Sequence, residues 1–229
     1  PTTGPLQSVF MVSATDGWAV GNVGTIIRWN GTHWSTVTKP ITTTLYSVSM
    51  VNSTDGWAVS TWGTIIRWNG ASWTTLVTKP TLDDLYSVFM VSATDGWIVG
   101  EWGTIIRWNG TDWSTVTKPT TTHLKSVFMI NANDGWAVGS GGTIIRWNGT
   151  DWSTMTSPTT THLNSVFMVG ASDGWAVGDS GTIIRWNGTQ WIPEFPTVIL
   201  MPLLISLTLV AVILAKTASK KRRSPLLPS

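Results

Sequence analysis

The sequence predicts an all-β protein, a β-propeller of five visible four-stranded blades followed by one C-terminal transmembrane helix. The first observation is a repeat: the triplet Asp-Gly-Trp recurs in steps of 39, 40, 39 and 39 residues, beginning at Asp16, Asp55, Asp95, Asp134 and Asp173. The second is that each unit carries four short segments of strand-favouring residues, the pattern of one propeller blade. The third is an uncharged apolar run over 198–215.

The first unit shows the predicted elements in order. After an irregular lead-in over 1–5, strands are expected over 6–12, 17–21, 24–30 and 33–38. Val, Ile, Thr and Trp are frequent in these segments, and Gly, Asn and Asp separate them. The Asp16-Gly17 pair predicts the first turn. The Asn30-Gly31 pair predicts a tight primed hairpin between the third and fourth strands, because both residue types tolerate positive φ.

Burial of both sheet faces favours a propeller over 6–192. One four-stranded sheet of this composition leaves two apolar faces, and stacking the units around an axis covers both. A linear β-solenoid is the alternative, although its coils are usually shorter and lack a hairpin in each unit. The last unit has only a short fourth strand, 190–192. Either five blades therefore close by direct packing of the end blades, or further blades lie upstream of Pro1.

Two stretches resemble known repeat families. The segment GTIIRWNGTHW is similar to an Asp-box (BNR-type) hairpin, with Asn30 where that family commonly has Asp, followed by Gly31 and Trp34. The wider unit LxSVFMVxxxDGWAVGxxGTII resembles propellers of the photosystem II assembly-factor type over residues 6–191. The resemblance implies the fold and a structural role for the Asp-box. The resemblance implies little about function, because propellers of this type have many different functions.

The charge distribution argues against nucleic-acid binding by the repeats. Five of the 14 Lys and Arg residues lie within 216–223, which leaves nine basic against 12 acidic residues elsewhere. A protein that neutralises phosphates needs a basic surface, and the repeat region has none. The chain has no cysteine, so disulfides and thiolate metal sites are excluded.

The C-terminal region predicts a membrane anchor. A linker over 193–197 precedes the apolar run 198–215, which as a helix would span roughly 27 Å, close to the thickness of a bilayer core. The tail 216–229 begins with a basic cluster, and basic residues beyond an apolar span mark the cytoplasmic side. The propeller is therefore expected outside the cell, anchored in the cytoplasmic membrane.

The linker and its flanks resemble the archaeal PEF-CTERM sorting signal, carried here by Pro193, Glu194, Phe195 and Pro196. That resemblance implies an archaeosortase-like enzyme as a partner that cuts the tail and replaces it with a lipid-type anchor. A plain transmembrane anchor is the alternative interpretation of the same residues.

One Asp and one Arg repeat in every unit. The arginines are Arg28, Arg67, Arg107, Arg146 and Arg185, and each lies 12 residues after the Asp of its own Asp-Gly-Trp triplet. A ring of arginines could collect an anionic ligand, as in sialidase-type sites. Strict repetition favours a structural Asp–Arg pair in each blade instead, because a ligand site rarely uses every blade equally.

The sequence does not predict an enzyme. Glycoside hydrolysis needs paired carboxylates or a Tyr nucleophile, and the acidic residues outside the repeated triplets form no such pair. The three histidines lack metal-ligand spacing, so neither a metal site nor a cofactor is expected.

Two connections differ from unit to unit, and in a four-stranded blade both lie at the same end. They are the two residues between the second and third strands and the segment that joins successive units. Variable loops on a uniform scaffold usually carry recognition. The candidate ligand-binding residues on and beside them are Asn22, Tyr46, Trp62, Tyr86, Glu101, Trp102 and Asp179. Tolerated drift in exposed loops is the alternative explanation.

Five Asn-X-Thr sequons are candidates for N-glycosylation: Asn30, Asn52, Asn109, Asn148 and Asn187. Four of them coincide with the Asn-Gly turns, so turn chemistry alone also explains those four. The function favoured by the sequence is non-enzymatic binding of a protein or glycan at the cell surface. The alternatives are a structural envelope or coat component and an assembly chaperone for a membrane complex, and a glycan hydrolase ranks last.

Overall fold

The structure is a computed structural model that describes residues 4–194. The predicted PEFPT linker lies partly outside this range, and the predicted transmembrane helix and basic tail lie wholly outside it. Among residues 4–194, no helix is long and apolar enough to cross a bilayer. The chain divides into two compact units, Pro1–Pro193 and Glu194–Ser229, and every described strand belongs to the first.

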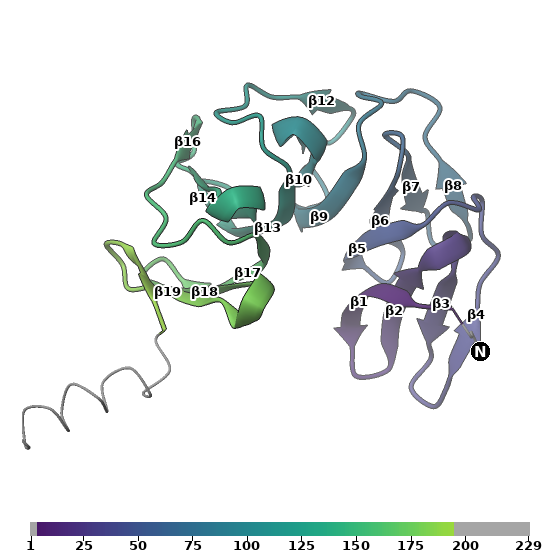
Figure 1. The fold of residues 1–229 in the computed structure, drawn as a ribbon. Helices are drawn as coiled ribbons and strands as arrows, with labels where there is room; N and C mark the ends of the chain where they lie inside the picture. Colours follow the sequence, from purple (N-terminus) through teal and green to yellow (C-terminus); the bar gives the residue numbers. More distant parts are fainter. Residues whose placement is uncertain (1–3, 195–229) are drawn as a thin grey trace, which may run out of the picture. The chain divides into compact units, whose positions relative to one another are not determined.

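The first unit contains five antiparallel sheets, each with its four strands in sequence order (Figure 1). Blade 1 comprises β1 (Leu6–Ser13), β2 (Asp16–Gly21), β3 (Ile26–Trp29) and β4 (Trp34–Thr36). Blade 2 comprises β5 (Leu45–Asn52), β6 (Asp55–Ser60), β7 (Ile65–Trp68) and β8 (Trp73–Thr75). Blade 3 comprises β9 (Leu85–Ser92), β10 (Asp95–Gly100), β11 (Ile105–Trp108) and β12 (Trp113–Thr115).

Blade 4 comprises β13 (Leu124–Asn131), β14 (Asp134–Gly139), β15 (Ile144–Trp147) and β16 (Trp152–Thr154). Blade 5 comprises β17 (Leu163–Gly170), β18 (Asp173–Gly178), β19 (Ile183–Trp186) and β20 (Trp191–Pro193). Short 3-10 turns precede the third strand of four blades: η1 (Asn22–Gly24), η2 (Glu101–Gly103), η3 (Ser140–Gly142) and η4 (Asp179–Gly181). The five four-stranded blades expected from the repeat are confirmed.

Blade-to-blade packing supplies the core. Four apolar clusters each join one blade to the next, and in the first of them Trp18 of blade 1 packs against Trp68 and Trp73 of blade 2. Alternation along each strand sends successive side chains to opposite faces, so a single blade contributes to two clusters. The first strands of consecutive blades, β1, β5, β9, β13 and β17, lie next to one another and form the inner row.

The structure corrects both predicted turns. The first reversal is made by Ala14 and Thr15, because Ser13 pairs with Asp16, and the Asp-Gly pair already belongs to β2. Gly17 is needed for space, since a Cβ there would overlap the Met11 sulfur. The second loop spans four residues between the paired Trp29 and Trp34 rather than two.

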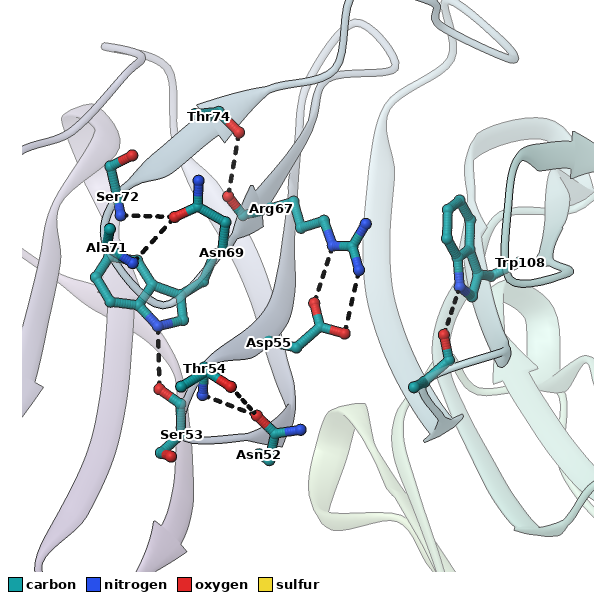
Figure 2. Close-up of polar contacts among 12 residues, drawn as sticks. Asn52, Ser53, Thr54, Asp55, Arg67, Asn69, Ala71, Ser72, Thr74 and Trp108 are labelled. Atoms are coloured by element: carbon teal, nitrogen blue, oxygen red, sulfur yellow. Dashed lines mark hydrogen bonds and ion pairs between the residues drawn. The ribbon is translucent and has the colours of Figure 1, made fainter.

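In that second loop only the glycine has positive φ, 93° at Gly31, so it is not a primed hairpin. The Asn30 side chain stabilises the loop instead, because its Oδ1 accepts the backbone N–H of Thr32 and of His33, both at 3.0 Å. This arrangement is a side-chain mimic of a backbone turn. Figure 2 shows the counterpart in blade 2, where Asn69 accepts from Ala71 and Ser72.

The fourth strands are shorter than predicted. Each has three residues, and the last, β20, is as long as the others and ends at Pro193. Of the two alternatives left open by the sequence, direct packing of the end blades is not seen among residues 4–194. Val9 on blade 1 is 62% exposed, whereas its counterpart Val48 on blade 2 is 4% exposed. Val177 on blade 5 is likewise exposed.

Candidate functional site

The two variable connections lie together in every blade, as predicted. In blade 1 the N–H of Asn22 donates to the carbonyl oxygen of Pro5, at 3.0 Å. In blade 3 the N–H of Glu101 donates to the carbonyl oxygen of Asp84, at 2.9 Å. In blades 1, 3, 4 and 5 the short loop is tied in this way to the segment that enters its own blade, whereas in blade 2 the N–H of Gly63 donates to the carbonyl oxygen of Asp83 in the connector that follows. The variable residues form one end of the propeller.

The second residue of each short loop has a left-handed backbone, with φ of 55° at Val23, 56° at Trp62, 52° at Trp102, 62° at Gly141 and 55° at Ser180. This conformation is unfavourable for residues other than glycine. The Lys79 ammonium donates to the Trp62 carbonyl oxygen at 2.7 Å, and Lys118 does the same for Trp102. The lysines help to hold both tryptophans in place.

Both tryptophans project from the surface. Trp62 is 68% exposed. The Trp102 ring packs beside the His123 imidazole, with ring centroids 4.9 Å apart, and the His123 Nδ1 accepts the N–H of Trp102. No ring contact joins Trp62 to Trp102 within residues 4–194. Each therefore lies on its own loop, and the two do not form a single aromatic platform.

The inner strands contribute the centre of the site. The second residue of the inner strand is of four types in the five blades: Gln7, Tyr46, Tyr86, Lys125 and Asn164. The Tyr46 and Tyr86 rings meet edge to face with centroids 5.5 Å apart. The Lys125 ammonium donates to the Asn164 Oδ1 at 2.8 Å. A hollow of about 290 Å³ is lined by Gln7, Tyr46, Tyr86, His123 and Lys125.

Three of the five inner-strand side chains bond to the short loop of their own blade. Gln7 donates to the Asn22 side chain at 2.9 Å, and the Tyr86 hydroxyl donates to the Glu101 carboxylate at 3.3 Å. In blade 5 the Asn164 amide donates to the Asp179 carboxylate at 2.6 Å. Four predicted residues, Asn22, Tyr86, Glu101 and Asp179, are thus held in this network.

The electrostatics around the two tyrosines favour their neutral forms. Burial raises the pKa of Tyr46 above its ordinary value, and the nearby carboxylates of Asp84 and Glu101 raise it further. Burial also raises the pKa of Tyr86, and its contact with Glu101 adds to the effect. Both phenols are therefore hydrogen-bond donors over the physiological range. Within residues 4–194, no group of three or more acidic or histidine side chains could hold a metal ion.

Four residues of the site were not singled out from the sequence: Gln7, His123, Lys125 and Asn164. Three of them occupy the same repeat position as Tyr46 and Tyr86, the variable residue of the motif LxSV. Comparing that one position across the five units would have identified them. His123 has a counterpart in His162 of the next connector, whose Nδ1 accepts the N–H of Gly141 just as His123 accepts that of Trp102.

The repeated Asp–Arg pairs form part of the scaffold. Each arginine makes an ion pair with the Asp of its own blade at 2.8–3.0 Å. Figure 2 shows the Arg67 guanidinium paired with the Asp55 carboxylate, with Trp108 of the next blade nearby. The Arg67 guanidinium lies over Trp57 of its own blade and Trp108, at 4.8 and 5.7 Å from the ring centroids. These arginines stabilise the packing between blades.

The candidate glycosylation residues also have intramolecular roles. Oδ1 of Asn52 accepts the N–H of Thr54, and Oδ1 of Asn109 accepts those of Thr111 and Asp112. In the same way, Oδ1 of Asn148 accepts the N–H groups of Thr150 and Asp151, and Oδ1 of Asn187 accepts those of Thr189 and Gln190. Glycosylation of these residues stays a prediction.

The fold is similar to solved β-propellers. YCF48 bound to D1 peptide is 19% identical with a TM-score of 0.67, covering 84% of this chain and 67% of that one. YCF48 from Cyanidioschyzon merolae is 16% identical with a TM-score of 0.66, covering 85% and 72%. The WD40 β-propeller domain of Doa1 is 15% identical with a TM-score of 0.68, covering 82% and 67%.

These similarities confirm the propeller fold and, at such identities, nothing finer. The sequence matches no protein-family model and no curated protein. Blade pattern, inter-blade tryptophans and structural neighbours together define a β-propeller protein whose variable end carries a hollow lined by polar and aromatic side chains. The Asp-box and sorting-signal resemblances stay predictions.

Proposed function

We propose that this protein is a non-enzymatic binding module that holds a segment of a partner protein at its variable end. One observation carries the proposal: the second residue of the inner strand is of four different types in the five blades, on a scaffold that otherwise repeats closely. Gln7, Tyr46, Tyr86 and Lys125 line one hollow. Residues that vary on a uniform scaffold are the ones able to select a ligand.

The chemistry of the hollow suits a peptide. The Tyr46 and Tyr86 rings offer apolar contact area at low entropic cost, with a hydroxyl on each for hydrogen bonding. Lys125 lines the hollow and supplies a positive charge, and the Glu101 carboxylate accepts from the hydroxyl of Tyr86, which also lines it. The hollow of about 290 Å³ is at the small end for a ligand pocket, so it suits a few side chains of an extended segment. Of the structural neighbours, YCF48 has been solved with a D1 peptide.

The test is selection of binding peptides from a displayed random library, followed by affinity measurement on variants. Tyr46→Ala combined with Tyr86→Ala should weaken binding at least tenfold, because it removes the aromatic pair. The control is Val77→Ala, a fully exposed residue on the outer part of blade 2. Equal affinity of the tyrosine variant and the control would exclude this hollow as the site.

A glycan is the second candidate ligand, and the exposed Trp62 and Trp102 favour it. An exposed indole can stack on a sugar ring. Trp62→Ala with Trp102→Ala should lower retention on an envelope polysaccharide column while leaving peptide affinity largely intact. If the same two substitutions abolish peptide affinity and leave polysaccharide retention unchanged, the loops serve a protein ligand.

We also propose that residues 198–215 anchor the protein in the membrane with the propeller outside the cell. The support is the apolar run followed by Lys and Arg residues. The full chain should sediment with membranes and the propeller should be accessible to protease added to intact cells. A chain ending at Glu194 should be released. Mass spectrometry of the mature C-terminus would reveal cleavage at the PEFPT segment, and an intact tail would exclude sorting-type processing.

A further inference from the structure

We propose that the variable end of the propeller lies against the lipid bilayer, with Trp62, Leu82 and Trp102 inserted among the lipid head groups. This contact depends on the membrane anchor proposed above, and it specifies which surface faces the bilayer and which side chains touch lipid. Three features support it: the direction in which the chain leaves blade 5, the location of exposed apolar side chains, and the charge of the same surface.

The outer strand of each blade runs toward the variable end. Each third strand begins beside a short loop at that end, and the fourth strand is antiparallel to it. In blade 5, Pro193 at the end of β20 is paired with Ile184 near the start of β19. Trp191, at the start of β20, is paired with Trp186 at the opposite end of the sheet. The chain therefore leaves blade 5 at the variable end.

A short linker joins this exit to the apolar run. Four residues, 194–197, separate Pro193 from residue 198. Each residue extends a chain by at most roughly 3.6 Å, so four residues reach about 14 Å. An anchor formed by 198–215 would thus hold the variable end close to the bilayer, rather than the uniform end with its Asn-Gly loops. The hollow is at this end too, so a peptide bound there would belong to a protein at the membrane surface.

Large apolar side chains are exposed at the variable end of the interior blades. Blades 2–4 each have a described neighbour on both sides, so exposure within them does not depend on where the sequence begins. Four large hydrophobic side chains of these blades and their connectors are exposed: Trp62, Val77, Leu82 and Trp102. Three of the four lie on the short loops and connectors, with exposed fractions of 68% at Trp62, 71% at Leu82 and 58% at Trp102.

The two indoles are held by backbone contacts. A lysine ammonium donates to the carbonyl oxygen of Trp62 and of Trp102, in each case at 2.7 Å. The Asp84 carboxylate accepts the N–H of Trp62 at 2.8 Å, and the His123 Nδ1 accepts that of Trp102 at 3.2 Å. Because the protein satisfies these backbone groups, only the side chains have to leave water. Trp is enriched at membrane–water interfaces, where its amphipathic ring lies at the level of the head groups.

The charges of the variable end balance. The short loops and the connectors between blades, with the adjoining inner-strand residues, carry four carboxylates and four ammonium groups: Asp83, Asp84, Glu101 and Asp179, and Lys39, Lys79, Lys118 and Lys125. The surface therefore has no net charge that would attract or repel anionic head groups. Contact depends on burial of the apolar side chains, so a vesicle of zwitterionic phosphatidylcholine is a sufficient target.

Quenching by labelled lipid tests the contact in the full chain, which has no native cysteine. Leu82→Cys is labelled with an NBD fluorophore, and the full chain is reconstituted in phosphatidylcholine vesicles with or without a doxyl-labelled lipid. The doxyl lipid should quench the label at residue 82 at least twofold, and the emission should shift to the blue because the label leaves water. Ala71→Cys is the control, because Ala71 is exposed on an Asn-Gly loop at the uniform end. Its label should be neither quenched nor shifted.

Trp62→Glu combined with Trp102→Glu tests the two indoles. A carboxylate resists transfer from water into the bilayer, so quenching at residue 82 should fall to the level of the label at residue 71. Ala71→Glu with Ser72→Glu adds two carboxylates to exposed residues at the uniform end and should leave quenching at residue 82 unchanged. Equal quenching in the two double variants overturns the proposal. Unchanged thermal unfolding of both double variants shows that the fold is retained.

Flotation of the same vesicles separates this contact from the anchor. A full chain that floats with the vesicles without quenching at residue 82 supports the anchor and overturns the contact. Equal quenching at residues 82 and 71 also overturns it, since neither end is then preferred. A full chain that does not float overturns the anchor and the contact together. If lipid does not quench the label and the two Glu substitutions abolish polysaccharide retention, the indoles serve a glycan, which again overturns the contact.

Discussion

At the residue scale, the same left-handed backbone recurs in all five short loops, although the residue that adopts it differs. Glycine occupies it only in blade 4, as Gly141. In the same blade Ser157 takes the repeat position of Lys39, Lys79 and Lys118, whose ammonium groups donate to the carbonyl oxygen of the left-handed residue. The lysine contact thus accompanies Val23, Trp62 and Trp102, whereas Ser180 of blade 5 adopts the same backbone without one among residues 4–194. Strain of this kind is retained at sites where the exposed side chain is useful.

This strain gives a prediction for Trp62. Trp62→Gly should be more stable than Trp62→Ala by about 1 kcal/mol, because only glycine adopts the left-handed region without steric cost. Urea unfolding of the two variants measures the difference, and both variants lack the indole. Equal stability would contradict the strained backbone at this residue.

The half-buried tyrosines predict a dependence of stability on alkaline pH. Because the folded pKa values of Tyr46 and Tyr86 lie above the ordinary 10.0, the unfolded chain ionises first as pH rises. Their contribution to stability is complete below about pH 10 and is lost as pH rises through the folded pKa values. Titration of tyrosinate absorbance should show both phenols ionising above pH 10.

Glu101→Gln is the matched variant for that titration. It removes a negative charge beside the Tyr86 hydroxyl, so the pKa of Tyr86 should fall, while burial keeps it above the ordinary value. An unchanged titration curve would show that Glu101 does not act on Tyr86.

At the element scale, the second strand of a blade and the connector entering that blade approach each other closely. In blade 4 the end of β14 lies against the connector at His123, and the N–H of Ser140 donates to the His123 carbonyl oxygen at 2.9 Å. A Cβ on Gly139 would overlap that same carbonyl oxygen. The glycine therefore permits this backbone contact in blade 4, whereas blade 2 has Ser60 at the same position and its hydroxyl donates to the carbonyl oxygen of Thr44 at 2.6 Å.

Gly139→Ala should consequently destabilise the protein by about 1–3 kcal/mol, since neither backbone can move without breaking hydrogen bonds. Gly170→Ala is the control, because a Cβ there meets no atom within 4 Å. Thermal or urea unfolding measures the stability of both variants. Similar stability of the two variants would mean that the connector can move away at little cost.

At the scale of the whole molecule, the described blades form a series in which each contacts its sequence neighbours. Stability in such a series is approximately a sum of blade and interface contributions. Interior interfaces bury the Trp of the second strand, as at Trp97 between blades 3 and 4, whereas among residues 4–194 no blade follows Trp175 of blade 5. The same Trp→Ala substitution should therefore lower stability by different amounts in different blades.

Trp97→Ala should cost about 3–5 kcal/mol, as expected for a fully buried indole, and Trp175→Ala clearly less. Unfolding at low protein concentration, where copies are separate, measures the difference. Equal costs at every concentration would contradict the series arrangement.

The sequence by itself determined the blade number, the four-strand pattern and the tryptophans between blades. These depend on local alternation, turn residues and a fixed period. It also indicated which end varies. Only the tertiary structure decided that Asn30 acts through its side chain, that Tyr86 bonds Glu101, and that Lys125 joins Asn164 across two blades. Those contacts join residues brought together by loop geometry and blade packing, so no local pattern encodes them. The exposed end faces belong to the same class, because burial depends on whether a neighbouring blade is present.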